Sequence, residues 1–111
     1  MTSPIEPESN LPWSEQYRVI SKKWVDADAA ADLLEELKSA TLSQLMSELG
    51  DMPVSRAEMT VKSDVEWKGY IKQMVEARQK ANRLKVQLEY LRMKFSEWQS
   101  HEATKRTEAR L

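Results

Sequence analysis

The residues best suited to chemistry in this 111-residue chain are a group of carboxylates and a row of cations. The carboxylates are spaced to share part of one helix surface, where such groups can hold magnesium between helices. They are Asp28, Asp32, Glu35 and Glu36. A magnesium site also needs acidic residues on a facing helix, yet the candidate partner helix offers only Glu76, Glu89 and Glu97 among an excess of cations. The acidic group is therefore interpreted as a solvated face. A magnesium-dependent nucleotide hydrolase that uses these carboxylates is the least favoured of three candidate functions.

The chain has few residues that could support other kinds of catalysis. His101 is the only histidine and there is no cysteine, which disfavours Ser–His–carboxylate, histidine–metal and thiolate sites. The two glycines, Gly50 and Gly69, stand apart and cannot form a phosphate-cradling loop. The sequence therefore predicts no catalytic residue, no metal site, no cofactor and no enzymatic activity.

The cations lie in the second half of the chain and point to a polyanion. Residues 68–111 hold 11 Lys and Arg against five Asp and Glu, whereas residues 1–67 hold six against 13. Cations spaced along one helix, with Tyr90, Phe95 and Trp98 nearby, are typical of a groove that binds single-stranded nucleic acid. The residues predicted to contact phosphate are Lys72, Arg78, Lys85, Arg92 and Lys94.

The same cations have an alternative interpretation, in which the basic half of the chain lies against the acidic half. Arg78, Lys85, Arg92 and Arg106 follow one another at seven-residue steps or multiples of seven. Asp28 and Glu35 have the matching spacing in the first half of the chain. Both interpretations can hold together in an oligomer whose basic ridge faces a central channel.

The composition favours helices over strands. Two glycines and four prolines are too few turn-forming residues for a sheet protein. With 32% charged and 41% apolar residues, the chain resembles neither a membrane protein nor a typical disordered chain. No apolar run approaches the roughly 20 residues that span a bilayer, so we expect no membrane partner. The predicted fold class is all-α.

The helix breakers divide the chain into a flexible N-terminal arm, residues 1–12, and a helical-hairpin domain, residues 13–111. The arm holds three of the four prolines. Two long antiparallel helices joined by a short connecting helix make up the predicted hairpin. The predicted helices cover about residues 14–49, 56–62 and 64–108.

Local signals support these boundaries. Ser14 is a plausible N-cap and Gly50 a plausible C′ glycine for the first helix. Ser55 and Ser63 begin capping boxes that precede the second and third helices. The apolar stripe of the first helix shifts to a new face after Leu34, which resembles a stutter in a heptad pattern.

The last helix has an unbroken apolar heptad pattern, which predicts a coiled-coil-like seam. Several apolar residues lie off this seam, namely Val75, Val86, Tyr90 and Met93, and they need a second surface to cover them. We therefore expect a homo-oligomer. The residues assigned to the core or oligomer seam are Trp67, Tyr70, Met74, Leu84, Leu88, Leu91, Phe95 and Trp98.

The stretch EYLRMKFSEWQSHEATKR, residues 89–106, resembles small helical accessory proteins encoded by phages and prophages. In size, helix content and its aromatic, basic second helix, the chain is similar to phage recombination mediators of the UvsY type. That resemblance implies an oligomer that binds single-stranded DNA and acts with a recombinase or a single-strand-binding protein. It also implies a location in the cytoplasm of a bacterial host cell.

These observations lead to a first and a second candidate function. The first is a non-enzymatic, oligomeric accessory protein associated with single-stranded DNA. The second is a protein–protein interaction module, such as a phage inhibitor or adaptor of a host complex, that does not bind nucleic acid.

Overall fold

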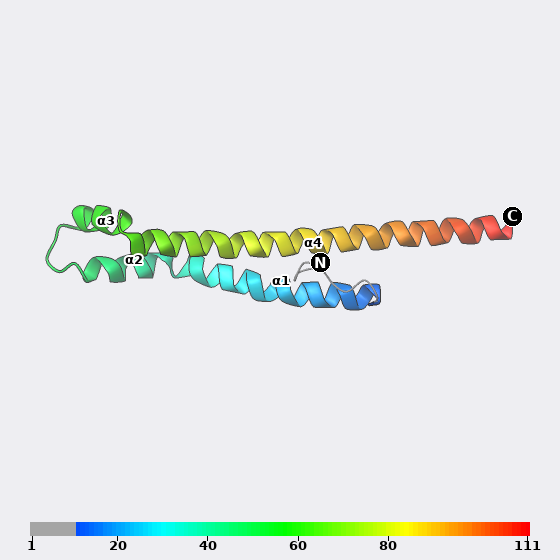
Figure 1. Ribbon diagram of the computed structural model, residues 1–111, viewed down its shortest axis with the longest axis horizontal. Helices are drawn as coiled ribbons and strands as arrows, with labels where there is room; N and C mark the ends of the chain where they lie inside the picture. Colours follow the sequence, from blue (N-terminus) through cyan, green and yellow to red (C-terminus); the bar gives the residue numbers. More distant parts are fainter. Residues whose placement is uncertain (1–10) are drawn as a thin grey trace. The chain divides into compact units, whose positions relative to one another are not determined.

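The computed structural model describes residues 11–111 and shows that this part of the chain contains four α-helices and no strand (Figure 1). The helices are α1 (Trp13–Glu36), α2 (Lys38–Ser47), α3 (Val54–Lys62) and α4 (Val65–Arg110). The prediction of an all-α fold with a pair of long helices is confirmed. The predicted arm lies outside the described residues, apart from Leu11 and Pro12.

The chain divides into two compact units. Among the described residues, the terminal unit combines residues 11–25 with residues 82–111, and the central unit is Asp26–Ala81. In each unit a segment of α1 lies antiparallel to a segment of α4 (Figure 1). None of the helices in residues 11–111 is long and apolar enough to cross a membrane.

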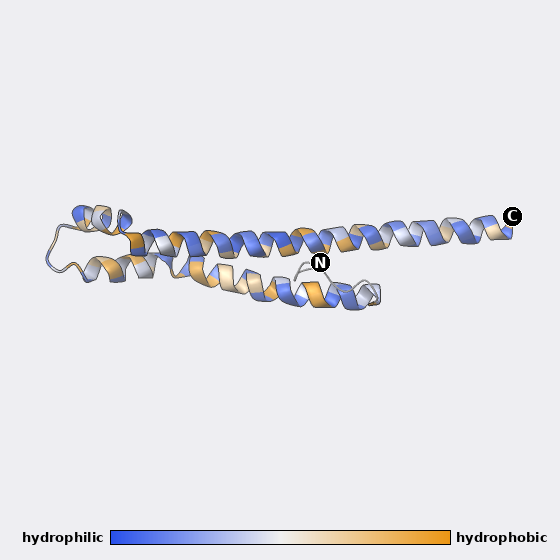
Figure 2. Cartoon of the chain, in the orientation of Figure 1, coloured by the Kyte–Doolittle hydropathy of each residue, from blue (hydrophilic) through white to orange (hydrophobic). Residues whose placement is uncertain are grey.

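The core of the terminal unit is small and apolar. Ile20 of α1 and Leu84 of α4 are almost fully buried, at 0% and 1% exposure, and Leu88 and Leu91 extend the buried row along α4. The buried Gln16 side chain donates a 2.6 Å hydrogen bond to the carbonyl of Leu11, so its burial leaves no unsatisfied polar group. Hydrophobic and hydrophilic residues alternate along α4, as expected for a helix with one buried side (Figure 2).

The core of the central unit is built from small residues around one tryptophan. Trp67 is 5% exposed, and its ring stacks on the ring of Tyr70 at a centroid distance of 5.7 Å. The other buried residues of this unit are Ala27, Ala31, Ala57, Val61 and Ala81. Four of these five residues are alanines, so the buried side chains of this unit other than Trp67 are small.

The first long helix is interrupted, whereas the sequence predicts one helix over residues 14–49. The structure ends α1 at Glu36 and begins α2 at Lys38, with Leu37 between them at φ −83° and ψ −2°. The hydroxyl of Tyr70 donates a hydrogen bond to the carbonyl of Leu34. In an uninterrupted α-helix that carbonyl would accept the N–H of residue 38, so a side chain occupies this position in the hydrogen-bond ladder.

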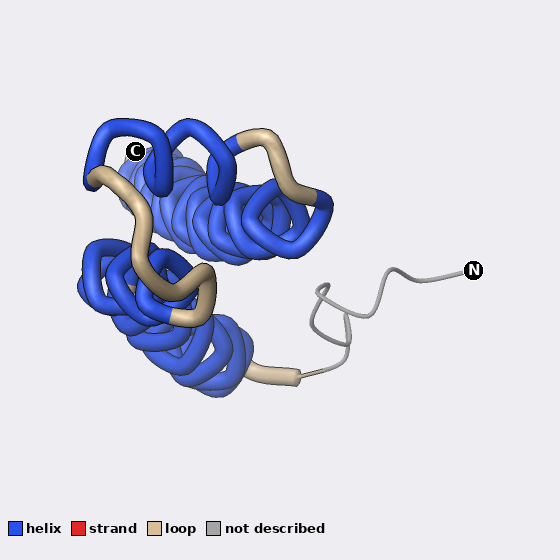
Figure 3. The backbone as a smooth tube through the Cα atoms, turned by 90° about the vertical axis from the view of Figure 1, so that its left-hand side faces the viewer, coloured by secondary structure: helices blue, strands red, loops and turns tan. Residues whose placement is uncertain are grey.

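The connector between the long helices contains α3 (Figure 3), which begins at Val54, so Ser55 lies within this helix and is not the N-cap that its capping box predicts. Pro53 precedes α3 without a side-chain cap, and Glu58 forms a 2.8 Å ion pair with Lys62. Ser63 directs its hydroxyl back to the carbonyls of Met59 and Thr60, at 3.0 Å each, and thereby caps the end of α3. Gly50 has φ +79°, a left-handed conformation that favours glycine.

Candidate nucleic-acid interface

An open groove of about 540 Å³ lies in the terminal unit between the start of α1 and the second half of α4. We call it the aromatic groove. Its lining is largely apolar, with one cation and two hydroxyl groups. The lining residues are Trp13, Ser14, Tyr17, Leu91, Arg92, Phe95 and Trp98.

Three aromatic rings form a continuous run in this groove. The ring of Phe95 lies 6.3 Å from the ring of Trp13, tilted by 55°, and 5.9 Å from the ring of Trp98, nearly parallel at 21°. Trp98 remains 46% exposed. Part of an indole surface is therefore open to solvent beside two further rings, an arrangement on which a planar aromatic ligand can stack.

Two cations lie at the edge of the aromatic groove. Arg92 donates a 3.0 Å hydrogen bond from Nη2 to the hydroxyl of Tyr17. Lys94 places Nζ 5.4 Å from the ring centroid of Trp13 and 5.9 Å from that of Tyr90, within the range of cation–π contacts. Both cations are exposed and can also reach an anion in solvent.

The surrounding unit is positively charged. Residues 11–25 and 82–111 carry ten Lys and Arg against five Asp and Glu, whereas residues 26–81 carry seven against 11. The described part of the terminal unit is therefore basic and the central unit is acidic. A polyanion that approaches the aromatic groove meets an excess of five positive charges in the described part of this unit.

The five cations predicted to contact phosphate are divided between the two units. Arg92 and Lys94 flank the aromatic groove, and Lys85 is exposed on α4, two helical turns before Arg92. Lys72 and Arg78 belong to the central unit. Lys72 is exposed, whereas Arg78 is half-buried and is surrounded by carboxylates.

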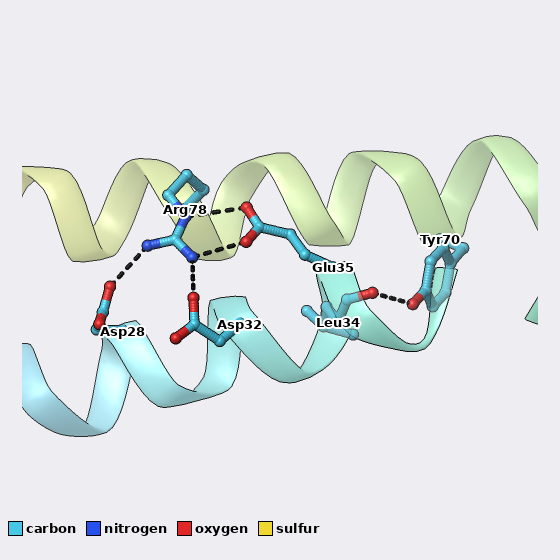
Figure 4. Close-up of polar contacts among 6 residues, drawn as sticks. All are labelled: Asp28, Asp32, Leu34, Glu35, Tyr70 and Arg78. Atoms are coloured by element: carbon cyan, nitrogen blue, oxygen red, sulfur yellow. Dashed lines mark hydrogen bonds and ion pairs between the residues drawn. The ribbon is translucent and has the colours of Figure 1, made fainter. Parts of the chain in front are cut away.

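Arg78 contacts three carboxylates of α1 (Figure 4). Its Nη1 lies 2.6 Å from Asp28, and its Nη2 lies 2.6 Å from Asp32 and 2.8 Å from Glu35. Nε adds a 3.0 Å hydrogen bond to the other Glu35 oxygen, which makes that pair bidentate. This arrangement corresponds to the alternative interpretation in which basic residues pair with the acidic half.

Three of the four carboxylates considered as magnesium ligands take part in these contacts with Arg78. Asp28, Asp32 and Glu35 face the Arg78 guanidinium, and Glu36 is exposed. Within residues 11–111, no group of three or more His, Asp or Glu side chains has the arrangement of a metal site.

The Arg78 cluster predicts a pH-dependent stability. The hydrogen bond from Arg78 holds the pKa of Glu35 below its usual value. A carboxyl whose pKa is depressed by folding stabilises the protein above its unfolded-state pKa, and this contribution disappears as the pH falls through the folded-state pKa. Arg78→Gln should therefore lower the melting temperature at pH 7 and reduce the further loss on acidification. Thermal melts of both proteins from neutral pH into the acid range measure this.

Lys62→Gln is the matched control, because Lys62 has a single exposed i,i+4 partner, Glu58. Such exposed pairs typically contribute about 0–1 kcal/mol, so its melting temperature should stay close to the parent value. The difference in melting temperature between the parent and Arg78→Gln should shrink as the pH falls. If this difference is the same at neutral and acid pH, the Glu35 contact does not stabilise the protein.

Of the groove residues on α4, Arg92 is a predicted phosphate contact, whereas Leu91, Phe95 and Trp98 are predicted seam residues. The two aromatic residues from α1 are not among the predicted site residues. Trp13 and Tyr17 carry no motif and are one helical turn apart, which is a spacing that core residues share. Their role becomes visible only because the antiparallel packing places them beside Phe95 and Arg92.

No family model, curated protein or solved structure matches the chain. The functional proposal therefore depends on the groove, its cations and the charge of the terminal unit.

Proposed function

We propose that the chain is a non-enzymatic, oligomeric accessory protein that binds single-stranded nucleic acid in the aromatic groove. The observation that carries the proposal is the combination of a run of three aromatic rings with Arg92 and Lys94 in the positively charged unit. Proteins that bind single strands combine aromatic platforms for the bases with cations along the backbone.

The groove suits unpaired bases better than a duplex. Base stacking on the ring of Trp98 requires a base face that is free, and in a duplex both faces of each base are stacked on neighbours. The exposed cations beside the groove supply the phosphate contacts, and Lys85 extends them along α4. We therefore propose a preference for single-stranded over double-stranded ligands.

The finer parts of the proposal concern assembly and partners. The resemblance to recombination mediators implies an oligomer that acts with a recombinase or a single-strand-binding protein in a phage-infected bacterial cell. Stacking and phosphate contacts would serve single-stranded DNA and RNA equally. We propose DNA because of the resemblance to recombination mediators.

Fluorescence anisotropy with a labelled single-stranded oligonucleotide tests the proposal. The parent protein should bind it more tightly than the corresponding duplex, with an affinity that falls as salt rises. Arg92→Ala/Lys94→Ala should weaken binding, and the slope of log affinity against log salt should decrease by about 0.7 for each phosphate interaction that the substitutions remove.

The matched control is Arg106→Ala/Arg110→Ala, which removes the same charge from the last two turns of α4, outside the groove. This variant should keep most of the affinity. Equal decreases in affinity in the two variants would show that net charge, and not the aromatic groove, determines binding.

A protein–protein interaction module is the second candidate, and exposed apolar side chains in the central unit favour it. Leu33 and Leu37 are 56% and 46% exposed near the end of α1, and Met59 is 74% exposed on α3. Large apolar residues exposed together on a unit are typical of protein interaction surfaces. If the parent protein binds no oligonucleotide even at low salt, this second function replaces the first.

A further inference from the structure

A second row of residues runs along α4 on the side away from the terminal-unit core. Its centre is apolar and exposed: Val86, Tyr90 and Met93 are 63%, 53% and 61% exposed. At 3.6 residues per turn, these residues lie on roughly the opposite side of the helix from the buried Leu84 and Leu88. A contiguous row of large apolar side chains on an exposed helix face is typical of an interaction surface.

The row ends in opposite charges. Arg83 precedes Val86 by three residues and Glu97 follows Met93 by four, and both charged side chains are exposed. Within the described residues, neither Arg83 nor Glu97 has an ion-pair partner. The complete row is Arg83, Val86, Tyr90, Met93 and Glu97, with alternating spacings of three and four residues, and we call it the outer row.

The outer row is complementary to itself when it is reversed. If two copies are placed antiparallel with their Tyr90 residues together, Val86 of each copy faces Met93 of the other. Arg83 of each copy then faces Glu97 of the other. The pattern therefore provides one aromatic layer, two apolar layers and two opposite-charge pairs over a helix length of roughly 21 Å.

We propose that a second copy of this chain covers the outer row, in a two-fold symmetric dimer whose α4 helices pack antiparallel about Tyr90. A parallel arrangement would place Arg83 against Arg83 and Glu97 against Glu97, which like-charge repulsion disfavours. An isologous interface requires a surface that complements itself, and the outer row has this property.

This inference rests on the oligomer of the proposed function and gives it a geometry, on a different side of α4 from the aromatic groove. The groove residues Leu91 and Phe95 lie on the side of the buried core, so a dimer formed through the outer row leaves the aromatic groove open. Among the residues given a role in the groove, Lys94 borders both surfaces, since its Nζ also lies over the Tyr90 ring. Dimerisation and oligonucleotide binding are therefore tested separately with variants that leave Lys94 in place.

Single-cysteine cross-linking tests the orientation, since the chain has no native cysteine. Tyr90→Cys should form an intermolecular disulfide under mild oxidation. Val86→Cys alone should form little, because residue 86 faces residue 93 of the other copy, whereas Val86→Cys/Met93→Cys should cross-link as readily as Tyr90→Cys. Efficient cross-linking of Val86→Cys alone would establish a parallel arrangement and overturn the proposal.

Charge exchange supplies a second test that leaves the apolar layers intact. Arg83→Glu and Glu97→Arg should each dimerise more weakly than the parent, because each creates like-charge pairs in its own dimer. An equimolar mixture of the two variants should dimerise more strongly than either alone, since both charge pairs are then opposite. A mixture no stronger than its components would overturn the antiparallel pairing.

The assembly itself is measured by sedimentation over a range of concentrations. The parent should approach twice the 12.9 kDa chain mass, and Tyr90→Glu should remain at one chain mass with an unchanged helical circular-dichroism spectrum. Val54→Glu, which alters an exposed apolar residue at the start of α3, is the control and should still dimerise. A parent that stays monomeric, or a Tyr90→Glu variant that dimerises like the parent, would overturn the proposal.

Discussion

Trp98→Ala is expected to weaken the affinity for a single-stranded oligonucleotide by about five- to 150-fold, since base–aromatic stacking is worth about 1–3 kcal/mol per base. The side chain is 46% exposed and rests against Phe95, so its removal takes away a stacking surface and only a small part of the core. An anisotropy titration at fixed salt measures the effect, and a thermal melt checks that the fold is retained.

Trp98→Phe is the conservative control for this prediction. It keeps an aromatic ring beside Phe95 and should retain most of the affinity. The groove hypothesis fails if Trp98→Ala binds as tightly as the parent, or if the alanine and phenylalanine variants lose affinity equally.

The second large effect is expected on stability. Leu84 is 1% exposed in the core of the terminal unit, so Leu84→Ala should lower the free energy of unfolding by about 2–5 kcal/mol through reduced burial and a new cavity. Urea denaturation followed by circular dichroism measures this, and an unchanged m-value would show that the unfolded state is comparable.

Val65→Ala is the matched control on the same helix. Val65 is 81% exposed at the start of α4, and a surface truncation of this kind is expected to change stability by no more than about 0.5 kcal/mol. A midpoint for Leu84→Ala that matches the control would place Leu84 outside the packed core.

The helices were predictable from the sequence because few residues interrupt their apolar periodicity. The row that includes Trp67, Leu84, Leu88 and Leu91 repeats with the helical period, and these residues are buried. The interruption at Leu37 was not predictable, because it coincides with a hydrogen bond from Tyr70, which lies 36 residues away in the sequence from Leu34. A local pattern carries no information about such a contact.

The candidate site was predictable to the extent that it belongs to one helix. Arg92, Lys94, Phe95 and Trp98 are close in sequence, so their common location follows from helical spacing. The contribution of Trp13 depends on the register between α1 and α4, which composition does not determine. In the central unit, the packing of α1 against α4 gives Arg78 its carboxylate partners. Spacing alone therefore could not decide whether Arg78 pairs with a ligand or with a neighbouring helix.

Photo-cross-linking tests most directly whether the aromatic groove holds the bases. The protein is irradiated with a halogenated-uracil oligonucleotide, and the modified peptides are identified by mass spectrometry. We expect adducts on the groove aromatics, chiefly Trp13 and Trp98, and far fewer adducts when Arg92 and Lys94 are both replaced by alanine. Adducts confined to residues 26–81, or no adducts at low salt, would contradict binding in the groove.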